Sequence, residues 1–286
     1  MTRPFVYIAG GIRTGSTLLS EALSAPETAL ILREPRLGAN RIVLREGDRD
    51  ELSRLGIEAD RVLTAPRRRL RVLRAMGKGG HPSGGAGRGR LSGYAARAFR
   101  DRIVRPLSGR VLQVGIKEVR HDGWEHVVAA FPGLACVAIA RDPRDVFLSH
   151  RARVIRRANT PPTPADFAAE FNRQFELQRA LIRATGALRV RYEDLCTVPA
   201  VLGRVRAHVE SPVTGTGSVG AFLATQPMRR TEAERHGGTI TDQRVARWTR
   251  EPDAMARRAA SDVFDRLGAY AAFWGYHADG RAPLAP

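Results

Sequence analysis

Short apolar runs alternate with helical patterns along this chain, and that alternation constrains the fold more than any other feature. The apolar runs cover residues 5–9, 29–32, 111–116, 134–140 and 188–192, and helical patterns begin near residues 18, 122, 142 and 164. Strand–helix–strand units place neighbouring strands parallel, with helices on both faces of the sheet. We therefore expect a three-layer α/β fold in which helices flank a central, mainly parallel sheet.

Two of the expected helices have clear local signals. Asp142 followed by Pro143 is typical of a helix start, because an acidic N-cap precedes a proline at the first helical position. Within residues 164–185, Phe167, Phe171 and Phe175 recur at helical intervals. This spacing predicts an amphipathic helix with an aromatic face.

The chain has 286 residues, of which 43% are hydrophobic, enough for one substantial core. We expect a single domain over residues 1–286. Residues 77–93 are rich in glycine, serine, proline and arginine, which predicts a mobile loop, either a lid or an idle insertion. No apolar run reaches the roughly 18 residues that cross a bilayer, and the N-terminus lacks the pattern of a secretory signal. We therefore expect a cytoplasmic protein without a membrane span.

The formal net charge of +18 is compatible with a nucleic-acid partner, but 45 of the 47 basic residues are arginine, which is typical of a GC-rich genome. The densest basic run, 67–74, is interleaved with leucine and valine, and we interpret it as a solvated helix face. No zinc-finger spacing or tandem repeat accompanies it. Cys136 and Cys196 have no metal-ligand spacing, and we expect them to be packing or idle thiols. Neither a nucleic-acid partner nor a metal is predicted.

Residues 10–19 read GGIRTGSTLL and lie between the first expected strand and helix. A glycine turn that leads into a helix N-terminus directs backbone N–H groups toward one small volume, which favours an anion. Further donors are the hydroxyls of Thr14, Ser16 and Thr17. The spacing from Gly10 to Gly15 matches the nucleotide-binding P-loop pattern GxxxxGK[ST], but Ser16 stands where that pattern has lysine. The turn therefore predicts a site for one phosphate or phosphosulfate rather than for ATP.

A second motif, residues 141–149, begins where another expected strand ends and runs into a helix. Ligands of open α/β sheets bind at that edge. Arg141 at the strand end and Ser149, eight positions later, can together hold one anion. The alternative for Arg141 is a simple ion pair with Asp145 or another acid.

These two segments, in this order, resemble the 5′-phosphosulfate loop and the 3′-phosphate site of sulfotransferases that use 3′-phosphoadenosine-5′-phosphosulfate (PAPS). A third segment, Tyr-Glu-Asp-Leu at 192–195 followed by Pro199, resembles an element that these enzymes carry after a core strand. The resemblance covers roughly residues 5–200 and is closer to the carbohydrate or bacterial type than to the cytosolic type. It implies a P-loop-like fold and an enzyme that transfers a sulfuryl group from PAPS to an acceptor hydroxyl.

The resemblance also implies roles for particular residues. The 5′-phosphosulfate group would be held by Arg13, Thr14, Gly15, Ser16 and Thr17. The 3′-phosphate would be held by Arg141 and Ser149, with Tyr192 near the adenine. Arg244, Arg247 and Trp248 resemble the family's C-terminal loop over the nucleotide, although its usual basic-glycine signature is altered. The product of the donor would be adenosine 3′,5′-bisphosphate.

For the catalytic base we favour Glu34, because carbohydrate-type relatives carry a glutamate just past the second strand. Pro35 should hold Glu34 extended and aim it. The alternative is that Glu34 merely pairs with Arg33 or Arg36.

The cytosolic members instead use a histidine shortly after a strand lysine. Here Val119 stands at that position, and Glu118 and His121 are the alternative bases. Lys117 is expected to contact a sulfuryl oxygen. Arg13 stands where many relatives carry a catalytic lysine, and because arginine stays protonated it can stabilise charge but scarcely donate a proton.

Two other classes stay open at the level of sequence. A P-loop kinase is the nearest other enzyme, and Ser16 at the lysine position argues against it. A basic nucleic-acid-binding protein would explain the charge but not three motifs at strand ends. The acceptor is a small molecule or glycan, and Glu34 favours a glycan or glycan-like alcohol.

Overall fold

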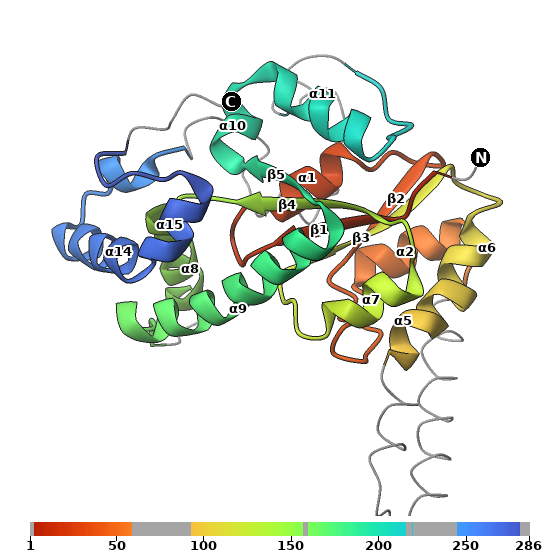
Figure 1. Cartoon of the computed structure of the whole chain (residues 1–286), viewed down its shortest axis with the longest axis horizontal. Coiled ribbons are helices and arrows are strands. Elements are labelled where there is room, and N and C mark those ends of the chain that lie inside the picture. Colours follow the sequence, from red (N-terminus) through yellow and green to blue (C-terminus); the bar gives the residue numbers. More distant parts are fainter. Residues whose placement is uncertain (1–2, 59–92, 157–159, 216–218, 220–244, 281–286) are drawn as a thin grey trace, which may run out of the picture.

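The computed structural model describes residues 3–58, 93–156, 160–215, 219 and 245–280. Its centre is a five-stranded parallel sheet in the order β2-β3-β1-β4-β5 (Figure 1). The strands are β1 (Val6–Gly10), β2 (Ala29–Arg33), β3 (Gln113–Glu118), β4 (Ala135–Ala140) and β5 (Leu188–Arg191). The predicted three-layer α/β fold with a parallel sheet is therefore confirmed.

Helices connect the strands and cover both faces of the sheet. Those before β4 are α1 (Ser16–Ala22), α2 (Glu46–Arg54), α5 (Tyr94–Phe99), the π-helical turn η2 (Arg100–Val104), α6 (Arg105–Leu107) and α7 (Trp124–Ala130). Those after β4 are α8 (Pro143–Ile155), α9 (Pro164–Thr185), α10 (Tyr192–Thr197), α11 (Pro199–His208), the 3₁₀ turn η4 (Arg247–Arg250), α14 (Ala254–Arg266) and α15 (Gly268–Trp274).

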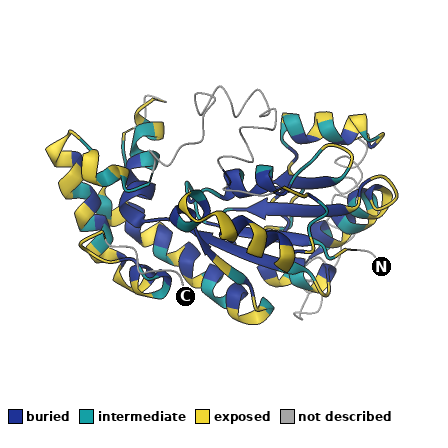
Figure 2. Cartoon of the chain, turned by 90° about the horizontal axis from the view of Figure 1, so that it is seen from above, coloured by how far each residue is buried: buried dark blue, intermediate teal, exposed yellow. Residues whose placement is uncertain are grey.

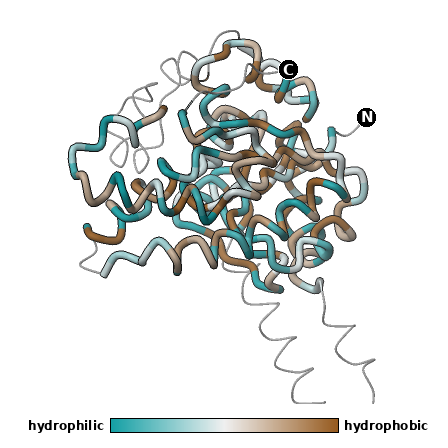
Figure 3. Tube along the Cα trace, turned by 60° about the vertical axis from the view of Figure 1, so that its left-hand side comes forward, coloured by the Kyte–Doolittle hydropathy of each residue, from teal (hydrophilic) through white to brown (hydrophobic). Residues whose placement is uncertain are grey.

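The two faces of the sheet support separate apolar clusters, because successive strand residues point to opposite sides. Val6 and Ile8 of β1 pack with α1, α10 and α11, whereas Tyr7 and Ala9 pack with α7 and α9. Figure 2 shows the sheet as a buried layer between helices whose outer sides are exposed, and Figure 3 shows hydrophobic segments gathered in the middle of the molecule. Strands buried on both faces are typical of parallel sheets, which explains why their sequences read as unbroken apolar runs.

The two clear helix signals are confirmed. The Asp142 carboxylate accepts a hydrogen bond from Arg144 N at 2.9 Å, and Pro143 opens α8. Along α9, the aromatic face of Phe167, Phe171 and Phe175 is buried. The α8 N-terminus and the α9 aromatic face both border the site described below.

Two element boundaries differ from the sequence prediction. Val111 does not begin β3, because its N–H bonds to Leu107 O at 2.9 Å and so continues the turn after α6. The strand runs two residues further, to Glu118. Helix α7 begins at Trp124 because Gly123 before it has a left-handed backbone, with φ of 70°.

Cys136 is buried, Cys196 is half-buried, and both are free thiols. Within the described residues, no helix is both long and apolar enough to cross a membrane. The basic run at 67–74 and, apart from Gly93, the predicted loop at 77–93 lie outside the described residues.

Candidate active site

The carboxyl ends of the five parallel strands meet at one edge of the sheet, and each end carries a residue that the sequence singled out. Arg13 follows β1, Glu34 follows β2, Lys117 lies near the end of β3, Arg141 follows β4 and Tyr192 follows β5. Such an edge is where open α/β sheets bind ligands. The predicted site residues are therefore on neighbouring strand ends.

The glycine turn after β1 packs directly against the residue that follows β5. Gly15 has φ of 90°, and a Cβ atom at this position would lie 2.3 Å from Cδ2 of Tyr192. Only glycine satisfies both the backbone angle and this close approach. Thr14 is buried and its hydroxyl donates to Gly11 O at 2.9 Å. The hydroxyl therefore fixes the shape of the turn, while Ser16 and Thr17 form the first turn of α1.

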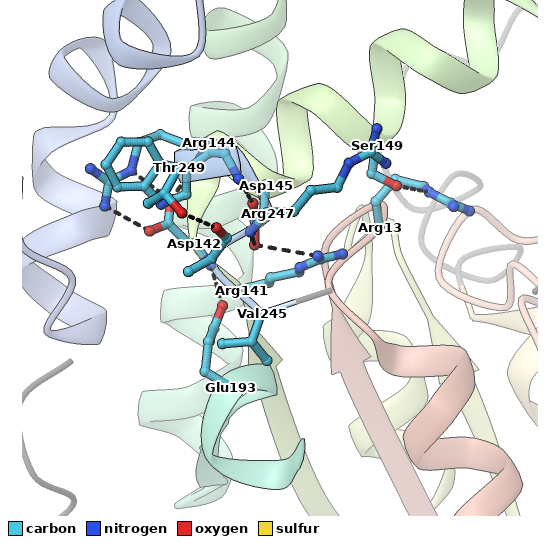
Figure 4. Close-up of polar contacts among 12 residues, drawn as sticks. Arg13, Arg141, Asp142, Arg144, Asp145, Ser149, Glu193, Val245, Arg247 and Thr249 are labelled. Carbon is cyan, nitrogen blue, oxygen red and sulfur yellow. Dashed lines mark hydrogen bonds and ion pairs between the residues drawn. The ribbon is translucent and has the colours of Figure 1, made fainter. Parts of the chain in front are cut away.

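Arg141 is held beside the same tyrosine. Its guanidinium lies over the Tyr192 ring, 4.5 Å from the centroid. It also lies 3.4 Å from the Asp145 carboxylate, a contact drawn in Figure 4. Its backbone is fixed as well, since its N–H donates to the Tyr270 hydroxyl at 3.1 Å and its carbonyl accepts from that hydroxyl at 3.0 Å. The Arg141–Asp145 ion pair considered at the sequence level is present. It accompanies the stacking on Tyr192 and does not replace it.

Arg13 and Ser149 are brought together from the turn after β1 and from α8. The Arg13 Nε donates to the Ser149 hydroxyl at 2.9 Å, which Figure 4 shows as a bridge between the two segments. Arg13 has φ of 62°, a left-handed conformation that is unusual for a residue other than glycine. Backbone of this kind persists where surrounding contacts determine it, and such positions cluster at functional sites.

Glu34 and Lys117 form an ion pair at the ends of β2 and β3. The Lys117 Nζ lies 2.6 Å from a Glu34 carboxylate oxygen, and Arg45 pairs with the other oxygen. Lys117 is almost fully buried. Burial alone would raise the pKa of Glu34, but the charges of Lys117 and Arg45 outweigh it and the pKa lies below its ordinary value. Glu34 is therefore an ionised carboxylate at neutral pH.

The expectation that Pro35 holds Glu34 extended is wrong. Glu34 has φ of 55°, and its N–H donates to Lys117 O at 2.6 Å. This bond to β3, together with the ion pairs of the side chain, turns the backbone immediately after β2. Arg36 is left-handed as well, with φ of 61°.

The two alternative bases are buried beside this pair and differ in ionisation. Glu118 accepts a hydrogen bond from Arg36 N at 2.6 Å, and burial raises its pKa to about 8. His121 lies with its Nε2 3.2 Å from Gly10 O, and burial lowers its pKa to about 4. Both groups are therefore mainly neutral at pH 7, unlike Glu34.

The C-terminal segment reaches the start of α8. The Asp145 carboxylate accepts hydrogen bonds from Trp248 N at 2.8 Å and from Arg247 N at 3.3 Å. The Arg144 guanidinium stacks on the Trp248 ring, 3.8 Å from the centroid. The predicted C-terminal residues Arg247, labelled in Figure 4, and Trp248 thus lie close to the Arg141 end of the site. Arg244 is outside the described residues.

Sequence reasoning missed several residues that position the site. Besides Tyr270, these include Glu193, whose carboxylate accepts from Asp142 N at 2.9 Å and from the Tyr276 hydroxyl at 2.8 Å. Burial raises the pKa of Glu193 to about 7. Glu193 lies within the motif at 192–195 and could have been found from it. The two tyrosines lie far away in the sequence and carried no local signal.

The glycine turn and the two arginines lie at the carboxyl edge of a parallel sheet, where open α/β proteins bind their ligands. Comparison gives the family: the chain belongs to the sulfotransferase family, whose model matches residues 4–215. No curated protein sequence matches it.

Two solved structures are similar in fold. The sulfotransferase domain from the curacin biosynthetic pathway has a TM-score of 0.58 and 15% identity, covering 96% of this chain and 98% of that chain. The sulfotransferase domain from the Synechococcus PCC 7002 olefin synthase has a TM-score of 0.53 and 20% identity, covering 94% of each chain. At these identities the likeness concerns the fold. The prediction of a sulfotransferase-type fold and family is thereby confirmed.

Proposed function

We propose that this protein transfers a sulfuryl group from PAPS to an acceptor hydroxyl. The observation that carries the proposal is the convergence of Gly15, Tyr192 and Arg141 in one packed cluster, with the Arg13–Ser149 bridge on the same sheet edge. This arrangement offers fixed positive charge, a glycine turn and an aromatic ring. These are the groups that an adenine nucleotide with two separate anionic ends requires.

The donor's two anionic ends would be bound by different strand ends. The turn formed by Arg13, Thr14, Gly15, Ser16 and Thr17 would hold the 5′-phosphosulfate. Arg141 and Ser149 would hold the 3′-phosphate, with Tyr192 beside the adenine and Arg247 closing the nucleotide from the C-terminal side. Arg141 fits the role of a 3′-phosphate ligand because it is held in a fixed position. It is buried, its guanidinium stacks on one face of Tyr192, and its backbone N–H donates to Tyr270.

When bound, PAPS supplies a sulfuryl group on a phosphate, which is a good leaving group. The acceptor hydroxyl would give its proton to the Glu34 carboxylate while its oxygen bonds to sulfur. The S–O bond to the 5′-phosphate would break, and its electron pair would stay on the phosphate. Lys117 and Arg13 would stabilise the negative charge around the transferred group. Since an ammonium carries three donors, Lys117 can keep its bond to Glu34 and still contact an oxygen of the substrate.

The ionised state of Glu34 supports its role as base. A general base must be deprotonated before the reaction, and Glu34 meets this condition because Lys117 and Arg45 lower its pKa. Glu118 is less suited at pH 7, because burial keeps it mainly protonated. His121 is neutral at this pH and stays the alternative base.

The kinase alternative is not favoured, because Ser16 occupies the position at which a P-loop kinase holds phosphate with lysine. A nucleic-acid-binding protein is not favoured either, since the site is built from buried and paired charges at strand ends rather than from an exposed basic stripe. The expectation of a glycan-like acceptor rests on Glu34 alone and stays a prediction.

Calorimetric titration with adenosine 3′,5′-bisphosphate and, separately, with ATP and magnesium tests the donor assignment. We expect saturable binding of the bisphosphate, its loss in Arg141→Ala, and no comparable binding of ATP. Arg266→Ala is the matched control, because its ion pair with Asp262 is on the surface. Tighter binding of ATP would overturn the proposal in favour of a kinase. If Arg141→Ala bound the bisphosphate as tightly as the wild type, Arg141 would not be part of the binding site.

A further inference from the structure

Arg45 reaches the Glu34 carboxylate from the beginning of α2, and burial does not fix its side chain there. The side chain is 39% exposed, and the residue is the N-cap of the helix. A long, partly exposed arginine loses conformational freedom when it holds one partner, so the contact depends on where its backbone is placed. The position of the first turn of α2 therefore decides whether Arg45 lies against Glu34.

Asp48 in that turn is fully buried and bonds to both chain segments. Its N–H donates to Arg45 O at 3.1 Å. Its carboxylate accepts from the N–H of Arg33, the last residue of β2, at 3.0 Å and from the Arg33 Nε at 3.4 Å. Because Arg33 directly precedes Glu34, Asp48 connects the backbone of Arg45 to the chain neighbour of Glu34.

The Arg33 guanidinium is enclosed in the same contact. It is buried and also lies 3.7 Å from the Glu21 carboxylate of α1. A Cβ atom at Gly47 would lie 3.0 Å from Nη2 of Arg33, so the absence of a side chain there lets α2 approach this group closely. A buried ion pair is costly to break, because each charge would be left buried without its partner. The beginning of α2 is therefore fixed to the end of β2.

This contact affects one of the two partners of the Glu34 carboxylate and not the other. The carboxylate pairs with Lys117 and with Arg45. Lys117 belongs to β3, and its carbonyl accepts from the Glu34 N–H at 2.6 Å, so it meets Glu34 through the sheet. Arg45 meets Glu34 only from α2, whose position Asp48 fixes. Asp48 therefore bears on the Arg45 contact.

We propose that Asp48 is a positioning residue for the base: by docking the first turn of α2 on the end of β2, it holds Arg45 against the Glu34 carboxylate. The inference rests on the proposed function, because it takes Glu34 as the base. Burial opposes the ionisation of Glu34 and the charges of Lys117 and Arg45 overcome it, so displacement of Arg45 would raise the pKa of Glu34. A base that is already protonated cannot accept the proton of the acceptor hydroxyl.

The test follows the Glu34 carboxyl by ¹³C NMR over a pH series, in protein labelled at the glutamate δ-carbon. Glu34→Gln identifies the signal by removing it. In Asp48→Asn we expect the titration midpoint of Glu34 to move to higher pH, because one amide oxygen cannot accept from both the N–H and the guanidinium of Arg33. Asp50→Asn is the matched control, since Asp50 is exposed on the same helix and should leave the midpoint unchanged.

The direction of the shift separates positioning from a direct charge effect. Removal of a negative charge near Glu34, as in Asp48→Asn, would by itself lower the pKa of Glu34. A midpoint that is unchanged or moves to lower pH would therefore overturn the inference. Asp48→Glu keeps the charge but lengthens the side chain, and it replaces Asp48→Asn if that variant does not fold. It should also move the midpoint to higher pH, and an unchanged midpoint would count equally against the inference.

Arg45→Ala shows whether the effect passes through Arg45. This substitution should move the midpoint to higher pH on its own, and Asp48→Asn should add no further rise in its presence. Rises that add in the double variant would mean that Asp48 acts on Glu34 by another route, and they would overturn the inference.

The inference and the proposed function can fail separately. In Asp48→Asn, affinity for adenosine 3′,5′-bisphosphate should stay within about two-fold of the wild type, because Arg33 and Arg45 lie at β2 and α2 rather than on the donor strands. Bisphosphate binding with an unmoved midpoint would overturn only the role of Asp48. Failure of the wild-type protein to bind the bisphosphate would overturn the proposed function and, with it, the catalytic meaning of the contact.

Discussion

The two halves of the proposed site are held together in different ways. The donor side, comprising Arg141, Asp145, Tyr192 and the segment at 247–248, is fixed largely by bonds to backbone atoms, such as those from Trp248 N to Asp145 and from Arg141 N to Tyr270. On the acceptor side, comprising Glu34, Lys117 and His121, the charges are paired mainly side chain to side chain. Hydrogen bonds to the backbone keep the donor side in one shape, which suits a nucleotide that is the same in every reaction. Paired side chains on the acceptor side can exchange partners during a reaction.

The largest effect is expected from a substitution that alters the acceptor side alone. In Glu34→Gln we expect turnover to fall about 10²- to 10⁴-fold, as for removal of a general base, with unchanged affinity for adenosine 3′,5′-bisphosphate. Turnover is measured as bisphosphate released from PAPS with the best acceptor from a screen. Glu176→Gln, which alters only a surface pair with Arg179, should be unaffected. Full activity in Glu34→Gln would move the base to Glu118 or His121.

The next effect concerns the stability of the donor side. Arg144 is buried, pairs with Asp142 at 2.7 Å and donates to His277 O and Ala278 O. Arg144→Met leaves Asp142 buried without its partner, and we expect a loss of about 3–5 kcal/mol in the free energy of unfolding. Arg266→Met, which removes an exposed pair, should change it by less than about 1 kcal/mol. Urea denaturation measures both free energies of unfolding. Similar losses in the two variants would contradict the expected difference between a buried and an exposed ion pair.

A pH series separates Glu118 from Glu34. Burial raises the pKa of Glu118 to about 8 in the folded protein, so between its unfolded value near 4.5 and pH 8 the folded state binds more protons than the unfolded one. The stability that Glu118 contributes is therefore present at low pH and lost as the pH rises through this window. We expect the free energy of unfolding to fall from pH 5.5 to 7.5, and less steeply in Glu118→Gln. An identical slope in the variant would show that Glu118 does not titrate there.

The smallest expected effect is at the hydrogen bond between Arg13 and Ser149. Ser149→Ala removes the hydroxyl that accepts from Arg13 at 2.9 Å. We expect bisphosphate affinity to fall about 2- to 10-fold, the value of one hydrogen bond. Ser261→Ala, on the outer side of α14, serves as the calorimetric control. A loss larger than that of Arg141→Ala would make Ser149 the main contact of the 3′-phosphate.

The sequence predicted the donor side better than the acceptor side. Gly15, Arg141 and Tyr192 follow strands or begin helices, and parallel strands bring such positions to one edge whatever the rest of the chain does. The partners of these residues were not predictable. Tyr270 lies 129 positions from Arg141, and its contact depends on how α15 packs.

The ion pairs of Glu34 show the same limit. Its charge partners are Lys117 and Arg45 rather than the neighbouring Arg33 or Arg36 that sequence proximity favoured, and Arg33 instead pairs with Asp48. Its backbone is left-handed, although a following proline generally favours an extended backbone. Both outcomes depend on β3 lying beside β2, a tertiary contact that no local pattern encodes.

The left-handed backbones of Arg13, Glu34 and Arg36 bear on how this protein can be engineered. Glycine adopts that conformation without strain, whereas other residues lose roughly 1–2 kcal/mol. A library screened only for heat resistance would therefore enrich glycine at Arg36, whose side chain is exposed, and not at Glu34, whose loss would leave Lys117 buried without its partner. At Arg13, glycine would remove the strain together with the guanidinium that is proposed to bind the donor, so selection for stability and selection for turnover would favour different residues at this position.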